Sequence, residues 1–344
     1  MILLLCTISL TFIITIILTP IIRSAAKKIQ IWAKHNNRTI HNGHVPLLGG
    51  VPIVVAFLCG VIFIYLFSGA QFDYLKRELI VFLLGGIIVH FTGIIDDIKG
   101  ISCYQKLTGQ FIAATIVILF GYNINQVISP FGNIISLGYF NIPFTLFWIV
   151  FLTNALNLID GLDGLAAGIT LGALFIMIAI SLWFNNLASA IPSAILAGTL
   201  AGFLIFNFNP AKIFLGDSGS LFLGFMLACF SINGTFRENA ALSMTIPIVV
   251  LGVPILDTTV AFVRRIKNGI HPFKADKYHI HHRVLNLGYS HRTTVLLLYG
   301  VSLFWGVIGL CMSIVYYPYH YFLLLLFFTS ILWGLKRIKM IRLF

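Results

Sequence analysis

Residues 141–164 read NIPFTLFWIVFLTNALNLIDGLDG. The first part of this stretch is almost entirely apolar, and the last part carries an amide or carboxylate at nearly every third position. An apolar run of about 20 residues is long enough for a helix to cross the hydrocarbon layer of a membrane. The stretch therefore predicts a transmembrane helix over residues 141–158 that ends in a polar site at one surface of the bilayer.

Long apolar stretches recur along the whole chain. Its 344 residues are 59% hydrophobic and only 9% charged, which excludes a soluble protein with a single core. The predicted fold is an all-α polytopic integral membrane protein, one transmembrane domain over residues 1–344, with a small outer hairpin around Val127–Gly138. Eleven transmembrane helices are expected, near residues 2–22, 46–68, 78–95, 107–122, 141–158, 165–184, 188–206, 219–236, 240–262, 293–315 and 319–335.

Basic residues are concentrated in alternate loops. Of the 22 Lys and Arg residues, all but Lys76, Arg77 and Arg237 fall in one set of loops and in the C-terminal segment. Cationic loops stay on the cytoplasmic side during insertion, which places the N-terminus outside and the C-terminus in the cytoplasm. The loops expected to carry the functional residues are then cytoplasmic, at approximately 23–45, 96–106, 157–164, 207–218 and 264–292.

Most of the ten acidic residues also fall on the predicted cytoplasmic side. A carboxylate at the centre of a membrane helix costs about 2.5 to 3.5 kcal/mol, so such groups usually face a cavity, a partner or a metal. A solvated loop acid explains any single one of them about as well. It does not explain several separate clusters on one face of the membrane.

The first cluster is the pair Asp96-Asp97, followed by Lys106. Adjacent carboxylates repel each other and are tolerated when a divalent cation or an ammonium group lies nearby. The pair is a weak motif by itself, because turns use Asp freely.

The second cluster is Asn154-x-x-Asn157-x-x-Asp160-Gly161-x-Asp163. Spacing of three places successive side chains on neighbouring helical positions, so these groups can line one wall of a site. This pattern is more specific than the first. The alternative is a helix end capped by Asn and Asp.

The third cluster is the turn FLGDSGS over residues 214–220. A glycine-rich turn before a helix presents free N–H groups that suit a phosphate, and Asp217 supplies the hard oxygen that Mg²⁺ prefers. As a plain N-cap, Asp217 or Ser218 needs no ligand.

The fourth cluster is His279-x-His281-His282-Arg283 in a basic loop. No cysteine or second histidine pair is placed to complete a tetrahedral zinc site, so contact with an anion is favoured. Anionic lipid headgroups would explain the Lys and Arg residues of this loop but not its histidines. Together the four clusters describe a site that binds a diphosphate and a divalent cation.

The motifs in these clusters resemble the polyprenyl-phosphate N-acetylhexosamine-1-phosphate transferases. The resemblance spans nearly the whole chain in the right order. It is carried by VPLLGG from Val45, Asp96-Asp97 with Lys106-Leu107-x-x-Gln110, NALNLIDGLDGL from Asn154, FLGDSGS from Phe214, Pro254-x-x-Asp257 with Arg264-Arg265, and HIHH from His279.

The resemblance implies a transfer of N-acetylhexosamine-1-phosphate from a UDP-sugar to undecaprenyl phosphate, with release of UMP. The expected cofactor is Mg²⁺ or Mn²⁺. The expected location is the inner or plasma membrane, among membrane lipids, with the site on the cytoplasmic face and no nucleic acid involved. By resemblance, the metal would be held by Asp217 and Asn154, the catalytic residues would be Asp96, Asp97, Lys106 and His279, the nucleotide side would be bound by Asn157, Asp160, Asp163 and Gly216, and the sugar and pyrophosphate by His281, His282 and Arg283.

The spaced His-x-His-His and the short segment between Asp97 and Lys106 resemble the branch that transfers N-acetylglucosamine-1-phosphate. The alternative enzyme is a phospho-N-acetylmuramoyl-pentapeptide transferase, whose histidines are usually contiguous. An alternative of another class is a lipid-phosphate transporter or flippase, which would carry polar residues near the bilayer midplane. The acidic residues here are concentrated at one end of the predicted helices, which disfavours a transporter. The oligomeric state is left open, with a homodimer as one alternative.

Overall fold

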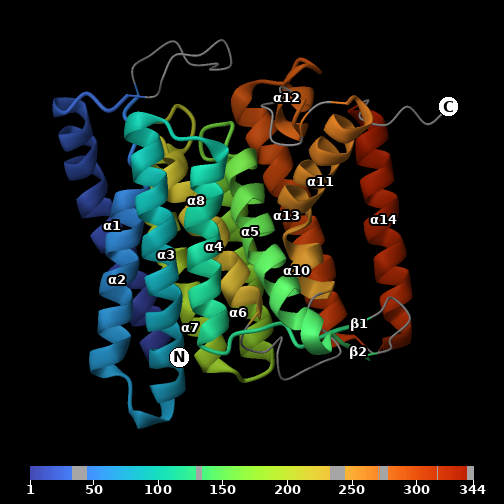
Figure 1. Cartoon of the computed structure of the whole chain (residues 1–344), viewed down its shortest axis with the longest axis horizontal. Helices are drawn as coiled ribbons and strands as arrows, with labels where there is room; N and C mark the ends of the chain where they lie inside the picture. Colours follow the sequence, from blue (N-terminus) through green and yellow to red (C-terminus); the bar gives the residue numbers. More distant parts are fainter. Residues whose placement is uncertain are drawn as a thin grey trace.

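Long helices that run side by side make up most of the chain (Figure 1). The structure is a computed structural model and describes residues 1–32, 45–128, 134–232, 245–269, 271, 278–315 and 317–338. The helices are α1 Ile2–Lys28, α2 Gly50–Phe67, α3 Asp73–Lys99, α4 Cys103–Leu119, α5 Asn141–Ile159, α6 Leu165–Trp183, α7 Leu187–Asn207, α8 Gly216–Ile232, α10 Thr245–Val250, α11 Gly252–Lys267, α12 Ile280–Leu285, α13 His291–Ile314 and α14 His320–Arg337. Short 3₁₀ turns are η1 Ala70–Phe72, η2 Gly138–Phe140 and η4 Tyr317–Tyr319.

Each of the eleven predicted apolar stretches overlaps a described helix. Seven of the described helices are long and apolar enough to cross a membrane by themselves, and α8 is apolar but shorter. The predicted all-α, multi-pass membrane architecture is confirmed. The eleven crossings and their orientation stay predictions. The seven are α1, α2, α3, α5 with η2, α6, α7 and α13.

The stretch predicted as one helix over residues 240–262 contains a break. Within its described part, α10 ends at Val250 and α11 begins at Gly252. Pro254 has no N–H to donate to the carbonyl of Val250, so an unbroken helix would lose a hydrogen bond there.

The predicted hairpin is present as two short antiparallel strands, β1 Gln126–Ile128 and β2 Ile134–Ser136. Val127 pairs with Ile135, and the turn between the strands lies outside the described residues. The hairpin lies at the end of the bundle that holds the N-terminus, opposite α12 (Figure 1).

α1 packs closely against α7 through a buried row of threonines. The hydroxyls of Thr7, Thr11, Thr15 and Thr19 each donate to the carbonyl four residues earlier, over 2.6 to 3.0 Å. With its hydroxyls satisfied internally, the row can face an apolar neighbour. A β-carbon at Gly198 of α7 would overlap the Thr11 side chain, so the small residue sets the close approach of the two helices.

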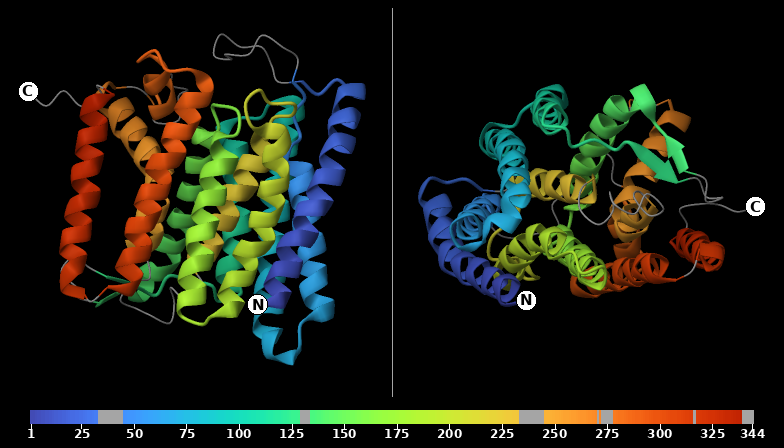
Figure 2. Two further views of the ribbon diagram at one scale, coloured as in Figure 1. Left: turned by 180° about the vertical axis from the view of Figure 1, so that it is seen from behind. Right: turned by 90° about the horizontal axis from the view of Figure 1, so that it is seen from below.

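The centre of the bundle is α8, which packs between α3 and α5. Every residue from Ser218 to Ile232 is buried, and the end-on view of Figure 2 shows other helices around α8. Two glycines of α3, Gly85 and Gly86, leave room for the rings of Phe225 and Phe222. This packing fixes the start of α8, and therefore Asp217, against the last turns of α3.

Candidate active site

The acidic residues of α3 and α8 meet around one lysine. The ammonium nitrogen of Lys106 lies 2.6 Å from Oδ2 of Asp96 and 2.5 Å from Oδ2 of Asp217. The three side chains are 15 to 26% exposed, so the ion pairs are largely shielded from water. Of the two groups expected beside the Asp pair, a divalent cation or an ammonium, the ammonium is present.

The turn between α3 and α4 places Lys106 at this position. Gly100 leaves α3 with a φ of +72°, a conformation that favours glycine, and Oδ1 of Asp96 accepts a hydrogen bond from the Ile101 N–H at 2.7 Å. Ser102 and Gln105 then form a reciprocal capping box at the start of α4. Lys106 follows directly, in the first turn of α4 and facing the acids.

Asp97 holds the start of α8. Its Oδ1 accepts from the N–H of Asp217 at 2.8 Å, and its Oδ2 accepts from the N–H of Ser218 at 3.1 Å. Gly216 has a φ of +70°, and a β-carbon there would overlap the Asp97 carboxylate. Asp97 therefore caps the α8 N-terminus and fixes the backbone that carries Asp217. Its predicted catalytic role and the predicted nucleotide contact of Gly216 stay predictions.

His90 is a residue that sequence reasoning missed. It is buried, and its Nδ1 lies 2.9 Å from the carbonyl oxygen of Ser218. Gly93, one turn further along α3, has no room for a β-carbon because the backbone of Asp217 and Ser218 lies against it. The spacing in the sequence could have indicated it, because residues 90, 93 and 97 lie on the same face of a helix as each other.

The two asparagines of the second cluster join α5 to its neighbours. The Asn154 amide donates to Oε1 of Gln110 at 2.6 Å and accepts from Nε2 of Gln110 at 3.3 Å. Gln110 follows Lys106 by one turn of α4. Asn157 donates to the Ser220 hydroxyl at 2.9 Å, on the first turns of α8. Both amides thus contact the helices that carry Lys106 and Asp217, while their roles toward a metal and a nucleotide stay predictions.

The two aspartates after α5 differ in their surroundings. Burial raises the pKa of Asp160 well above its usual range, and the negative charges of Asp217 and Asp97 raise it further. Oδ2 of Asp163 instead accepts from the Asn209 amide and from the Ala211 N–H, both at 3.0 Å. Asp163 therefore anchors the 208–212 segment. Asp160 instead interacts electrostatically with the acidic centre, which consists of Asp96, Asp97 and Asp217 around Lys106.

The histidines are arranged around Asp257, which is fully buried. Its Oδ2 lies 2.7 Å from Nδ1 of His279, and its Oδ1 accepts from the Ile280 N–H at 2.7 Å. The rings of His279 and His281 stack with centroids 5.8 Å apart. Burial lowers the pKa of His281 to about 3, so its imidazole is neutral near pH 7.

The remaining predicted residues of this loop, His282 and Arg283, contact aromatic rings. The ring of His282 is 4.3 Å from that of His281 between centroids. The guanidinium groups of Arg283 and Arg264 each lie 5.6 Å from the ring centroid of Tyr278. The part of the loop over residues 272–277, and residues 33–44 of the first predicted loop, lie outside the described residues.

The four sequence clusters form one connected region at one end of the bundle (Figure 1). Asp160 interacts electrostatically with Asp217 and Asp97. The next residue, Gly161, packs against the ring of His281, and a β-carbon there would overlap the imidazole. The loop after α5 thus joins the acidic centre to the histidines.

The donor atoms of this region suit a hard divalent cation. Carboxylate oxygens are the ligands that Mg²⁺ prefers. Burial raises the pKa of Asp160, and the nearby negative charges of Asp217 and Asp97 raise it further. Within the described residues, no three His, Cys, Asp or Glu side chains are arranged around one metal position. The Lys106 ammonium lies between Asp96 and Asp217 instead.

Comparisons with known proteins confirm the family resemblance of the sequence. Residues 79–235 match the family described as glycosyl transferase family 4. A probable undecaprenyl-phosphate N-acetylglucosaminyl 1-phosphate transferase of Bacillus subtilis is 36% identical over 293 residues, covering 85% of this chain and 80% of the relative.

Two further relatives are similar over most of their length. A decaprenyl-phosphate N-acetylglucosaminephosphotransferase of Mycobacterium leprae is 34% identical over 83% of this chain and 78% of its own. An undecaprenyl-phosphate alpha-N-acetylglucosaminyl 1-phosphate transferase of Escherichia coli K12 is 27% identical over 93% of this chain and 86% of its own. The family match covers most of α3 and all of α4 to α8, and together with the relatives above it shows that the chain belongs to glycosyl transferase family 4.

Proposed function

We propose that this protein transfers N-acetylglucosamine-1-phosphate from UDP-N-acetylglucosamine to undecaprenyl phosphate and releases UMP. The reaction would be the first membrane step of a cell-envelope polysaccharide, on the cytoplasmic face of the plasma membrane. The observation that carries the proposal is Lys106 held between Asp96 and Asp217 at one end of the bundle. The names of the Bacillus and Escherichia relatives support N-acetylglucosamine as the sugar.

The proposed reaction needs little covalent chemistry from the protein. An oxygen of the lipid phosphate attacks the phosphorus bonded to the sugar, and the bond from that phosphorus to the UMP oxygen breaks. A lipid phosphate is already largely ionised at neutral pH, so no side chain has to remove a proton. Positioning and neutralisation of charge then account for most of the catalysis.

The contacts of each residue indicate its part in positioning the substrates and neutralising their charge. Lys106 would turn from the carboxylates to phosphate oxygens of the substrates, since its ammonium already holds two negatively charged groups. Asp97 keeps Asp217 in place through the α8 backbone. His279 is oriented by Asp257 through its Nδ1, and its neighbour His281 packs against Gly161.

Mg²⁺ or Mn²⁺ would be held by Asp217, with Asp96, Asp160 and Asn154 as the neighbouring oxygen donors. When bound, the cation would neutralise the diphosphate and stabilise UMP as it leaves. Binding of the cation would favour the ionised form of Asp160, whose pKa is raised by burial and by the negative charges of Asp217 and Asp97.

The topology that goes with this proposal has eleven crossings, with the N-terminus outside. The concentration of Lys and Arg in alternate loops supports it. The acidic centre is then at the cytoplasmic surface, where soluble UDP-sugars are available.

The test is turnover by the purified full-length protein with undecaprenyl phosphate, Mg²⁺ and one UDP-sugar at a time. The panel is UDP-N-acetylglucosamine, UDP-N-acetylgalactosamine and UDP-N-acetylmuramoyl-pentapeptide. We expect UMP release and a lipid-linked product with UDP-N-acetylglucosamine, lost when either the lipid or the cation is omitted. Turnover of the muramoyl-pentapeptide substrate alone would contradict the proposal.

A further inference from the structure

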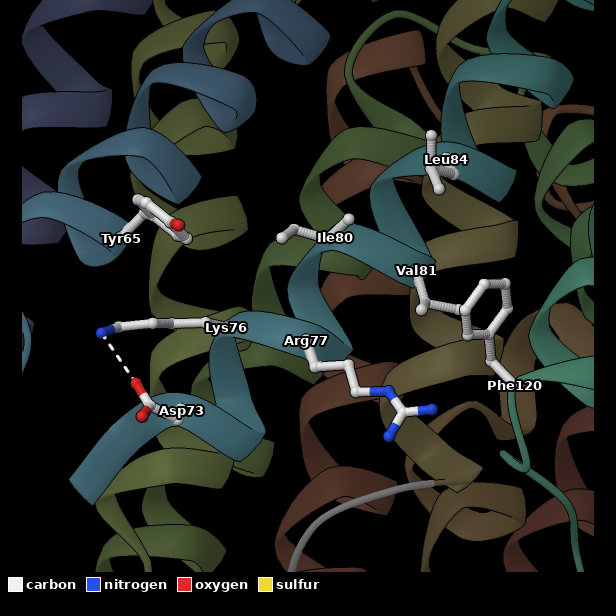
Figure 3. A pocket seen from close by; sticks show the side chains of 8 residues that line it. All are labelled: Tyr65, Asp73, Lys76, Arg77, Ile80, Val81, Leu84 and Phe120. Atoms are coloured by element: carbon white, nitrogen blue, oxygen red, sulfur yellow. Dashed lines mark hydrogen bonds and ion pairs between the residues drawn. The ribbon is translucent and has the colours of Figure 1, made fainter. Parts of the chain in front are cut away.

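A cavity of about 470 Å³ lies where the start of α3 meets the ends of α2 and α4 (Figure 3). Lys76 and the acidic centre are at opposite ends of α3. The rise of an α-helix places Lys76 and Asp97 about 30 Å apart, which is about the thickness of the hydrocarbon layer. The cavity is therefore at the other membrane interface and cannot take part in the proposed reaction.

One side of this cavity is cationic. Lys76 pairs with Asp73 at 3.0 Å, and its ammonium lies 5.7 Å from the ring centroid of Tyr65. Arg77 is exposed, and no ionic or hydrogen-bonding partner is found for it among the described residues. Figure 3 shows the two basic side chains extending to different sides of α3. An unpaired guanidinium is well suited to bind a phosphate through two parallel hydrogen bonds.

The other side of the cavity is apolar. Ile80 and Leu84 are 42% and 47% exposed and follow Lys76 at successive turns of α3, so they form a stripe that leads toward the middle of the bilayer. Phe120, beyond the end of α4, is 47% exposed and lies beside Val81 (Figure 3). A ligand that fits both sides has an anionic head at the membrane surface and a hydrocarbon chain below it.

We propose that this cavity binds an anionic phospholipid from the leaflet opposite the acidic centre. The lipid phosphate would contact Arg77, Lys76 would add positive charge at the same membrane surface, and one acyl chain would follow Ile80 and Leu84. A soluble phosphate would leave the apolar stripe uncovered. The cationic group of a zwitterionic lipid would add a positive charge to a surface that already has two basic residues and one acid.

The test is lipid binding to the full-length protein in detergent, followed by native mass spectrometry. Dioleoylphosphatidylglycerol is compared with dioleoylphosphatidylcholine. A basic residue near a membrane surface contributes about 1 kcal/mol to binding of anionic lipid, which is about fivefold in affinity. We expect Arg77→Gln to weaken binding of the tightest phosphatidylglycerol about fivefold, and Lys76→Gln with Arg77→Gln about 25-fold.

The matched control is Arg337→Gln, which removes an exposed arginine beside the aromatic ring of Trp333 at the other end of the chain. It should leave the tightest phosphatidylglycerol site unchanged. Leu84→Gln keeps both cations and should weaken binding through the acyl chain. Equal affinity of the wild-type protein for both lipids, or unchanged affinity of Arg77→Gln, would overturn the proposal. Displacement of the lipid by glycerol 1-phosphate at equal concentration would also overturn it.

Discussion

Lys106 joins two helices that bring acids to the same point, since it contacts Asp96 of α3 and Asp217 of α8. Removing one group that stabilises charge in a transition state commonly lowers kcat about 10²- to 10³-fold. We expect Lys106→Gln to lower the rate of UMP release by about this factor. Lys336→Gln, which removes an exposed lysine in the last turn of α14, is the control and should keep the wild-type rate. A Lys106→Gln rate equal to that of the control would remove Lys106 from the mechanism.

His281 should act as a neutral group. Burial lowers its pKa to about 3, whereas an imidazole in the unfolded chain has a pKa of about 6.5. Acidification below pH 6.5 therefore protonates the unfolded chain first, and the free energy of unfolding falls as the pH drops toward 3. We expect wild type and His281→Gln to give pH–rate profiles of the same shape between pH 5.5 and 8, measured as UMP release. An acidic limb near pH 6.5 that disappears in His281→Gln would contradict the neutral assignment.

The sequence motifs predict which residues gather at this end of the bundle but few of their partners. Spacing of three in the Asn154 motif shows which side chains share a helix face. It does not show that Asn154 meets Gln110 or that Asp163 binds the 208–212 segment, because those contacts depend on how different helices pack. His90 was missed because a single buried histidine in an apolar helix has no motif around it.

At the scale of elements, the close contact between α3 and the start of α8 sets the position of Asp217. Gly93→Ala would place a β-carbon against the backbone of Asp217 and Ser218. Overpacking of this kind costs about 1 to 3 kcal/mol, so we expect a lower thermal midpoint in detergent together with lower turnover. Gly172→Ala in α6 is the matched control, because no atom lies within 4 Å of the added β-carbon, and it should keep both properties. Equal behaviour of the two variants would contradict the described packing.

The elements themselves follow closely from hydropathy. Each predicted apolar stretch overlaps a helix, because only helices satisfy the backbone of a lipid-exposed segment. The break between α10 and α11 was missed because hydropathy counts Pro254 as one more residue of an apolar run. The capping of α8 by Asp97 was also beyond a sequence argument, since the two groups are 120 positions apart in the chain.

At the scale of the whole molecule, α3 connects two chemically different ends. Its last turn carries Asp96 and Asp97, beside Lys106 and Asp217, and its first turns line the cavity with Lys76 and Arg77. The loss of Arg77 should therefore not alter the acidic centre directly. This separation makes the proposed reaction and the proposed lipid site independent in experiment, so failure of one does not imply failure of the other.

The central claim is that Lys106 and Asp217 act together on one diphosphate. The most direct test is a double-mutant cycle on UMP release from UDP-N-acetylglucosamine, with Lys106→Gln, Asp217→Asn and the two combined. Residues that act as a unit show strongly non-additive losses. We predict a loss of about a hundredfold or more in each single variant and little further loss in the double variant. Losses that multiply, or an Asp217→Asn variant as active as wild type, would contradict the shared site.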